Sequence, residues 1–206
     1  MNELILASMS PRRRDLLESI GLEFEVVPSD VEEIPAPGEQ VRDYVLRLAR
    51  EKAESIGGRH PDAWIIAADT VVYLDDRILE KPRDHDEAFA MLSTIAGRWH
   101  TVFSGVALHH SAGGHLDCRL EETRVRIMAL EPSEIEWYVE TGEPFDKAGA
   151  YAVQGIGAMF VEAVEGSYTN VVGLPLPLLF RMMRDAGIDP IPHHQESWRR
   201  KEGAAS

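Results

Sequence analysis

A serine- and arginine-rich tract near the N-terminus has the composition of a phosphate-binding turn. It runs from Ser8 to Arg14, between a short apolar run and a helical pattern that ends at Gly21. Ser10 is predicted to cap this helix, and Pro11 suits its first position, where the missing N–H costs nothing. Three arginines would then crowd the positive end of the helix dipole, an arrangement that a bound polyanion relieves. The alternative is a solvated basic turn.

Two acidic segments offer carboxylates for metal binding or proton transfer. Asp69 follows the apolar run of a short predicted strand, and burying an unpaired carboxylate is costly. Asp69 is therefore expected either at the exposed C-terminal end of that strand, where ligands of open α/β sheets gather, or beside a cation. Glu33, in the Glu32-Glu33 loop, is either a metal ligand or part of a solvated acidic loop.

Lysines at two further positions add positive charge. Lys52 lies inside an amphipathic helical pattern, where a surface lysine is the ordinary interpretation. Lys81 stands between a strand pattern and Pro82. A compact ammonium held by a proline-fixed turn suits phosphate, although lysines at hairpin ends are common.

A polar cluster follows in the segment that ends at Gly155. Asp146 and Lys147 are adjacent, and the small residues after them permit close backbone approach. Gln154 carries an amide that can hydrogen-bond a base edge as both donor and acceptor. A plain glycine-rich turn would explain the glycines but not the clustering of the polar side chains.

Apolar periodicity and turn residues predict the elements that must position these side chains. Strands are expected over residues 4–7, 22–26, 64–68, 99–109, 115–128 and 158–164, with a hairpin turn at Asp75-Asp76. Helices are expected from Pro11, over residues 41–56, from the capping-box pattern of Asp84 and Glu87, and over residues 132–141 and 176–186. The alternation predicts an α/β fold with a mixed sheet.

Composition narrows the class of ligand. The chain of 206 residues has 44% hydrophobic and 27% charged residues, as expected of one globular domain or two small lobes. Its formal net charge of −14 argues against general nucleic-acid binding and leaves a small anionic ligand held by local cations. A single cysteine, Cys118, excludes an internal disulfide framework and a thiolate metal cage.

The ends of the chain carry few signals. The N-terminus lacks the features of a signal peptide and no apolar run reaches membrane-spanning length, so no membrane association and a cytoplasmic location are expected. Residues 1–188 are expected to form a single domain, and residues 189–206, which lack apolar periodicity, a mobile tail.

Taken together, the polar tracts resemble the Maf family of nucleoside triphosphate pyrophosphatases over roughly residues 4–187. The matching tracts occur in one order: Ser8-x-Ser10-Pro11-Arg12-Arg13, Ala68-Asp69-Thr70-Val71-Val72, Lys81-Pro82, Gly97-Arg98-Trp99-His100-Thr101-Val102, Tyr138-Val139-Glu140-Thr141-Gly142-Glu143-Pro144, Asp146-Lys147-Ala148-Gly149-Ala150-Tyr151-x-x-Gln154-Gly155 and Gly166-Ser167-Tyr168-x-Asn170-Val171-Val172-Gly173-Leu174-Pro175. The resemblance implies a mixed, elongated sheet with flanking helices and a deep cleft between two lobes, similar to that of inosine triphosphate pyrophosphatases.

The resemblance also implies an activity, the hydrolysis of a nucleoside triphosphate to the monophosphate and pyrophosphate, with a divalent cation, Mg²⁺ or Mn²⁺, as cofactor. It implies a cytoplasmic location, in many members a homodimer, and a link to nucleotide-pool control and division arrest. Arg12, Thr70 and Gln154 match the branch that hydrolyses dTTP and UTP, whereas the 7-methyl-GTP branch differs at the first two positions. Glu80 and Ser104 depart from the glycine and threonine frequent in the family.

The polar residues, taken together with the resemblance, suggest a mechanism and a role for each of them. Phosphates would be held by Ser8, Arg12, Arg13, Lys52 and Lys81. Glu33 and Asp69 would hold the metal ion, with Asp69 also acting as general base. Specificity for the pyrimidine would come from Arg12, Thr70 and Gln154, Asp146 would support the cleft, and Lys147 would support it or contact a phosphate. Two alternatives remain: a 7-methyl-GTP or purine-type pyrophosphatase, and a non-catalytic nucleotide sensor that regulates division through a protein partner.

Overall fold

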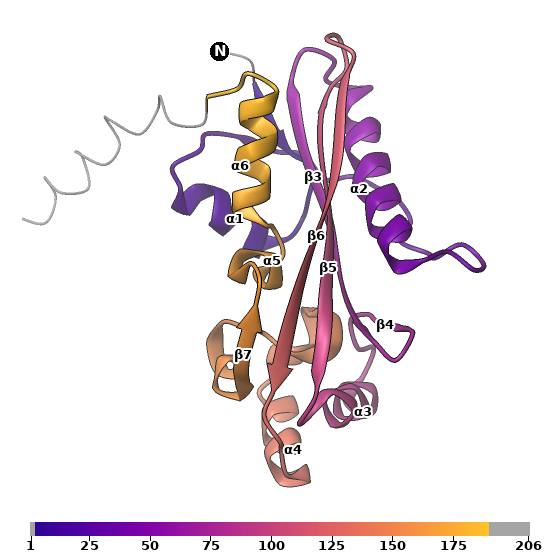
Figure 1. Cartoon of the computed structure of the whole chain (residues 1–206), viewed down its shortest axis with the longest axis vertical. Helices are drawn as coiled ribbons and strands as arrows, with labels where there is room; N and C mark the ends of the chain where they lie inside the picture. Colours follow the sequence, from indigo (N-terminus) through magenta and orange to yellow (C-terminus); the bar gives the residue numbers. More distant parts are fainter. Residues whose placement is uncertain (1–2, 190–206) are drawn as a thin grey trace, which may run out of the picture.

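Three long strands run through the structure, a computed structural model in which residues 3–189 are described (Figure 1). The mobile tail predicted for residues 189–206 lies, apart from its first residue, outside the described residues. The strands are β1 (Leu4–Leu6), β2 (Glu25–Val26), β3 (Trp64–Leu74), β4 (Arg77–Leu79), β5 (Trp99–His110), β6 (His115–Ile127) and β7 (Val161–Glu165).

The strands form one mixed sheet, as the sequence predicts. Their order is β2-β1-β3-β5-β6-β7, and β4 pairs with β3 outside this path. β1 is parallel to both β2 and β3, and the remaining pairs are antiparallel. The β5–β6 hairpin extends along most of the long axis of the molecule, so it joins the two ends of the structure (Figure 1).

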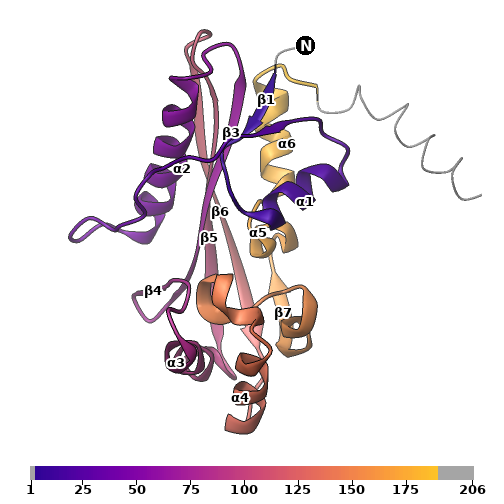
Figure 2. The ribbon, with the colours of Figure 1, turned by 180° about the vertical axis from the view of Figure 1, so that it is seen from behind.

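Helices cover both faces of one half of this sheet. The helices are α1 (Pro11–Ser19), α2 (Val41–Gly57), α3 (His85–Ile95), α4 (Pro132–Glu140), α5 (Tyr168–Val172) and α6 (Leu176–Asp185), with 3₁₀ turns η1 (Glu143–Asp146), η2 (Ala148–Ala150) and η3 (Gly155–Phe160). α2 lies on one side of the long strands, and α1 and α6 lie on the other (Figures 1 and 2). None of the described helices has the length and apolar character needed to cross a membrane.

Alternate residues of β3 pack against these two helical layers. Ile66 and Ala68 belong to the apolar cluster that contains residues of α1 and α6, whereas Ile65 and Ala67 belong to the cluster that contains residues of α2. Because both faces of the strand are buried, its sequence is a continuous apolar run rather than an alternating one.

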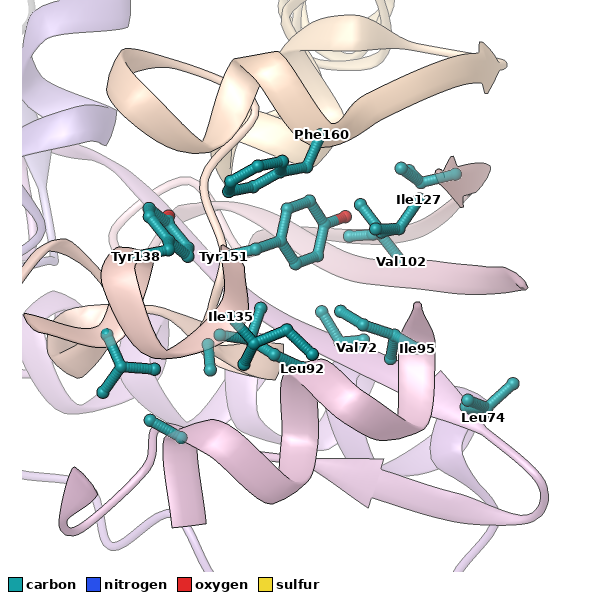
Figure 3. Close-up of a cluster of buried hydrophobic side chains, with 14 residues drawn as sticks. Val72, Leu74, Leu92, Ile95, Val102, Ile127, Ile135, Tyr138, Tyr151 and Phe160 are labelled. Atoms are coloured by element: carbon teal, nitrogen blue, oxygen red, sulfur yellow. The ribbon is translucent and has the colours of Figure 1, made fainter. Parts of the chain in front are cut away.

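A separate apolar cluster holds the other end of the molecule together (Figure 3). It joins Val72 of β3 and Val102 of β5 to Leu92 of α3 and Tyr138 of α4. The long strands therefore connect two packed regions, one at each end of the sheet.

Several details differ from the sequence-based expectations. Residues 158–160 were expected in a strand but belong to η3, so β7 begins only at Val161. β3 does not end before Asp69 but continues to Leu74, β2 has only two residues, and the short helix α5 was not predicted. Ser10 occupies the N-cap position of α1 without a side-chain capping bond. The predicted hairpin turn is confirmed, because Asp75 and Asp76 have φ values of 51° and 59°, as a type I′ turn requires.

Candidate active site

A cavity opens at a break in strand pairing along one edge of β3. On this edge β1 pairs with β3 as far as Ile66, and β4 pairs with it from Val72 onward. On the opposite edge β5 pairs with β3 throughout this region. Asp69 and Thr70 lie in the gap between β1 and β4, where a cavity of about 340 Å³ is found.

The cavity has both charged and apolar walls. Its charged lining consists of Arg12, Arg13, Glu33, Lys52, Asp69, Lys81, Glu143 and Lys147. Its apolar and aromatic lining consists of Val72, Val102, Ala148, Tyr151, Ala152, Val153, Val171 and Val172. A ligand with a polyanionic part and a flat, weakly polar part fits this combination.

Asp69 is paired with a lysine from α2. Lys52 Nζ donates to Asp69 Oδ1 at 2.7 Å and to Glu33 Oε1 at 2.5 Å. The side chains of Lys52 and Asp69 are only 6% and 7% exposed, whereas that of Glu33 is 53% exposed. Of the two expectations for Asp69, the exposed strand end is wrong and the cation partner is right. The interpretation of Lys52 as a surface lysine is also wrong, because its side chain is buried against Asp69.

The electrostatic environment keeps Glu33 ionised. Burial raises the pKa of Glu33, but the hydrogen bond from Lys52 and the charges of Lys52, Lys81 and Arg13 outweigh it, so the pKa lies below its ordinary value. Glu33 and Asp69 each offer a second carboxylate oxygen that the bond from Lys52 does not use. Among residues 3–189 no group of three or more acidic, histidine or cysteine side chains could hold a metal ion, so a cation here would rely on these two carboxylates.

The arginines of the first tract have different environments. Arg13 is half-buried and donates to Gly173 O at 2.8 Å, Ser8 Oγ at 3.1 Å and Thr70 Oγ1 at 3.2 Å. Burial lowers the pKa of Arg13 despite the nearby charges of Asp69 and Glu33. The solvated interpretation describes only the third arginine of the tract, Arg14, whose ion pairs with neighbouring residues of α1 are exposed.

Arg12 joins the cavity to the polar cluster near residue 146. Its guanidinium donates to Asp146 Oδ2 at 2.6 Å and to Asp146 O at 3.1 Å. Lys147 Nζ donates to Asp146 Oδ1 at 2.5 Å and to Glu143 O at 2.7 Å. Asp146 itself is not part of the cavity lining, so it supports two cations that are.

The predicted specificity residues lie in two different parts of the wall. Thr70 Oγ1 is 2.7 Å from Ser104 Oγ and 3.2 Å from Gly173 O, within the network that holds Arg13. Ser104 therefore supplies a hydroxyl partner for Thr70. Gln154 lines the cavity just before η3, among residues of the apolar wall.

The remaining predicted residues are also placed by the structure. Lys81 lines the cavity, and the neighbouring Glu80 is not part of the lining. Ser8 is buried behind the lining, where it accepts from Arg13 and from the backbone of Ser10. The residues expected to bind phosphate, metal and base therefore meet at one cavity, with Ser8 and Asp146 behind its surface.

Two further groups were not assigned a role from the sequence. Glu143 belongs to a matched tract, yet nothing local indicated that its carboxylate would lie in the cavity wall. Tyr151 lines the cavity, and its hydroxyl is 2.8 Å from Nε2 of the buried His100. Burial lowers the pKa of His100 to about 4, so the imidazole is neutral at pH 7.

The fold and the cavity define an α/β protein with a cleft suited to a phosphorylated, partly apolar ligand. The model of the Maf-like protein family matches residues 3–186, and the chain belongs to this family. A dTTP/UTP pyrophosphatase of Myxococcus xanthus is 51% identical over 92% of this chain and 94% of its own length. A dTTP/UTP pyrophosphatase of Thermoanaerobacter sp. is 47% identical over 88% of this chain and 95% of its own length.

Comparison with solved structures supports the fold. The Ham1 protein of Staphylococcus aureus superimposes with a TM-score of 0.52, and the alignment covers 90% of this chain and 100% of that protein. The two sequences are 12% identical, so the likeness concerns the fold alone.

Proposed function

We propose that this protein hydrolyses dTTP and UTP to the nucleoside monophosphate and pyrophosphate. The observation that carries the proposal is the cluster of four cationic side chains around the Asp69–Lys52–Glu33 group, with an apolar wall in the same cavity. The cationic cluster would bind the triphosphate, and the apolar wall would contact the pyrimidine. The names of relatives that are about half identical over nearly their whole length support the same substrates.

The cations of the cavity would bind the phosphates. Lys81, Arg12 and Lys147 line it from different segments, and Arg13 is already held by three hydrogen bonds to the protein. A side chain that is ordered before binding loses less conformational entropy when the ligand arrives. Lys52 reaches the phosphates only if it loosens its bonds to the two carboxylates, so we assign it chiefly to orienting Asp69.

Asp69 is the general base of the proposed reaction. Its carboxylate takes a proton from water, whose oxygen bonds to the α-phosphorus while the bond to the bridging oxygen breaks and pyrophosphate leaves. Asp69 lines the cavity, and Lys52 fixes one of its oxygens, which would leave the other oxygen for the water. A base must stand within hydrogen-bond reach of the water, and this fixed orientation supports that geometry.

Two carboxylates with unused oxygens fit Mg²⁺ or Mn²⁺, because these hard cations take oxygen ligands and Mg²⁺ keeps several waters. Glu33 and Asp69 would hold such a cation, which would neutralise the charge of the triphosphate. The pair is sparse for a permanent metal site but sufficient where substrate oxygens complete the coordination.

Gln154 would read the base edge, since a carbonyl-imide edge matches one amide donor and one amide acceptor. Thr70 would leave room for the pyrimidine ring beside Asp69. Arg12 would be the third residue, with Thr70 and Gln154, that determines specificity for pyrimidine nucleotides. The further proposals are a cytoplasmic enzyme with a single domain over residues 1–188, two lobes around the cleft, and a homodimer without general affinity for nucleic acids or membranes.

A panel of nucleoside triphosphates with Mg²⁺, scored for pyrophosphate and orthophosphate, tests the proposal. Pyrophosphate should appear fastest from dTTP and UTP, and excess EDTA should stop its release. Orthophosphate as the first product, or full activity in EDTA, would contradict it. Faster hydrolysis of purine nucleotides or of 7-methyl-GTP would assign the enzyme a different substrate. Binding of nucleotides without turnover would indicate a nucleotide sensor.

A further inference from the structure

The carboxylate of Glu143 is enclosed by hydrogen-bond donors beside Gln154. Oε1 accepts from Tyr138 Oη at 2.8 Å and from the backbone N–H of Gly157 at 2.8 Å. Oε2 accepts from the backbone N–H of Ile156 at 2.9 Å. Both oxygens therefore hold the turn that begins η3, immediately after Gln154.

This arrangement requires both terminal oxygens of the Glu143 side chain to be hydrogen-bond acceptors. Burial raises the pKa of Glu143. The hydrogen bonds from Gly157 N–H, Ile156 N–H and the Tyr138 hydroxyl, together with the charge of Lys147, outweigh this effect, so the pKa lies below its ordinary value and the carboxylate stays ionised. A glutamine would turn an NH₂ group toward one of these donors and leave that donor without an acceptor.

The turn is shaped around the carboxylate. Gly155 has a φ of 70°, and a Cβ at this position would lie 2.5 Å from Glu143 Oε2. A Cβ on Gly157 would lie 2.4 Å from Tyr138 Oη and 2.6 Å from Ala152 O. Only glycines allow the backbone to approach the carboxylate and its phenol partner this closely.

Tyr138 anchors this group in the apolar cluster that contains Val72 and Leu92 (Figure 3). The residue is fully buried, its ring packs edge-on against Phe160 with 5.2 Å between centroids, and its hydroxyl also accepts from the N–H of Ala152 at 3.3 Å. The carboxylate thus links a rigid core to the cavity wall.

We propose that Glu143 is a positioning residue for nucleobase selection, which fixes the turn after Gln154 and thereby holds the Gln154 amide in one orientation. The inference rests on the proposed function, because it assumes that Gln154 reads the base. Gln154 itself is an exposed side chain, so the backbone on either side of it must supply its order. The backbone carbonyl of Glu143 also accepts a hydrogen bond from Lys147 Nζ. Glu143 therefore contacts one of the proposed phosphate-binding cations as well as the turn after Gln154.

A double-mutant cycle on selectivity tests the proposal. The kcat/KM values for dTTP, UTP, dATP and dGTP are measured for the wild type, Glu143→Gln, Gln154→Ala and the double variant. Glu143→Gln should lower the dTTP-to-dATP ratio about tenfold, the scale of a mispaired hydrogen-bonded group. In the Gln154→Ala background the same change should move the ratio less than about twofold, because the residue through which it acts is gone.

Two further variants keep the test decisive. Glu140→Gln, on the exposed face of α4, is the matched control and should leave the ratio unchanged. Gly155→Ala keeps the carboxylate but displaces the turn, so it should lower the ratio in the same direction; it decides the case if Glu143→Gln does not fold, as judged by melting temperature.

A uniform loss of rate in Glu143→Gln with an unchanged ratio would overturn the proposal, since it would show a purely structural role. An equal change of the ratio with and without Gln154 would also overturn it. Failure of the proposed function is a separate result, because the wild type would then release no pyrophosphate from dTTP or UTP.

Discussion

Lys52 Nζ lies 2.7 Å from Asp69 Oδ1, and both side chains are more than nine-tenths buried. The pair joins α2 to the centre of β3, at the point where the edge of β3 is free of strand partners. Burying either charge alone is costly, so each residue makes the position of the other tolerable. The same contact orients the carboxylate that we propose as general base.

Removing the lysine should therefore destabilise the protein strongly. Lys52→Met keeps the length of the side chain but leaves Asp69 buried without its cation, and should lower the free energy of unfolding by about 3–5 kcal/mol. Lys52→Met combined with Asp69→Asn should recover part of this loss. Urea denaturation of the single and double variants measures the coupling; strictly additive losses would show that the pair contributes no interaction of its own.

Asp69→Asn should lower kcat by roughly 10²-fold or more, the usual scale of a lost general base. The substitution keeps the shape of the side chain, and Lys52 keeps its hydrogen bond to Glu33, so circular dichroism should show an intact fold. Steady-state pyrophosphate release gives kcat, and an unchanged value would exclude Asp69 from the chemistry.

The position of Asp69 shows where a local pattern stops being informative. The apolar run predicted a strand, but the carboxylate suggested that the strand ends there. β3 continues through it because Lys52, seventeen positions earlier in the sequence, supplies the compensating charge. The packing of α2 on β3 brings this partner to Asp69, and the sequence of the strand alone does not indicate it. The long β5 and β6 strands were predicted, and so were five of the six α-helices found within residues 3–189, because their signals are local.

The short helix α5 was missed for a related reason. Its five residues are too few to form a stable helix alone. The side-chain amide of the buried Asn170 bonds Val102 O at 3.1 Å and Thr123 Oγ1 at 3.0 Å, which docks the helix on the sheet. The candidate site was predicted largely through motif order, whereas Glu143 gained its role only from contacts with a turn more than ten residues away.

The arginine tract contains its own matched control. Arg13→Ala removes three hydrogen bonds inside the protein and a proposed phosphate contact, so KM should rise and should depend less on salt than in the wild type, because one charge contact is gone. Its unfolding free energy should fall by about 1–3 kcal/mol, because buried acceptors lose their donor. Arg14→Ala, on the exposed side of the same helical turn, should change neither. Equal KM values for both variants at low and high salt would show that Arg13 does not contact the phosphates.

His100 should make the protein less stable in acid. The folded protein holds its pKa near 4, below the ordinary value of 6.5, so the unfolded chain takes up a proton first as the pH falls. Stability is therefore complete above pH 6.5 and is lost progressively toward pH 4, by up to about 3 kcal/mol.

Urea denaturation at several pH values between 7 and 4 measures this loss. His100→Gln, which does not titrate, should flatten the decline, whereas His85→Gln, on the surface, should follow the wild type. Identical curves for the wild type and His100→Gln would assign the acid sensitivity to other groups.

Thr70 should affect binding in two separable ways, through its hydroxyl and through its size. Thr70→Val keeps the size and removes the hydroxyl that accepts from Arg13 Nη2 and contacts Ser104 Oγ. KM should therefore rise for every nucleotide alike, by about threefold to tenfold, the effect of one lost hydrogen bond. Thr70→Glu fills the space beside Asp69 and should lower the preference for dTTP and UTP over purine nucleotides. Relative kcat/KM values across the panel separate the two effects, and a base-dependent change in Thr70→Val would mean that the hydroxyl itself contacts the ring.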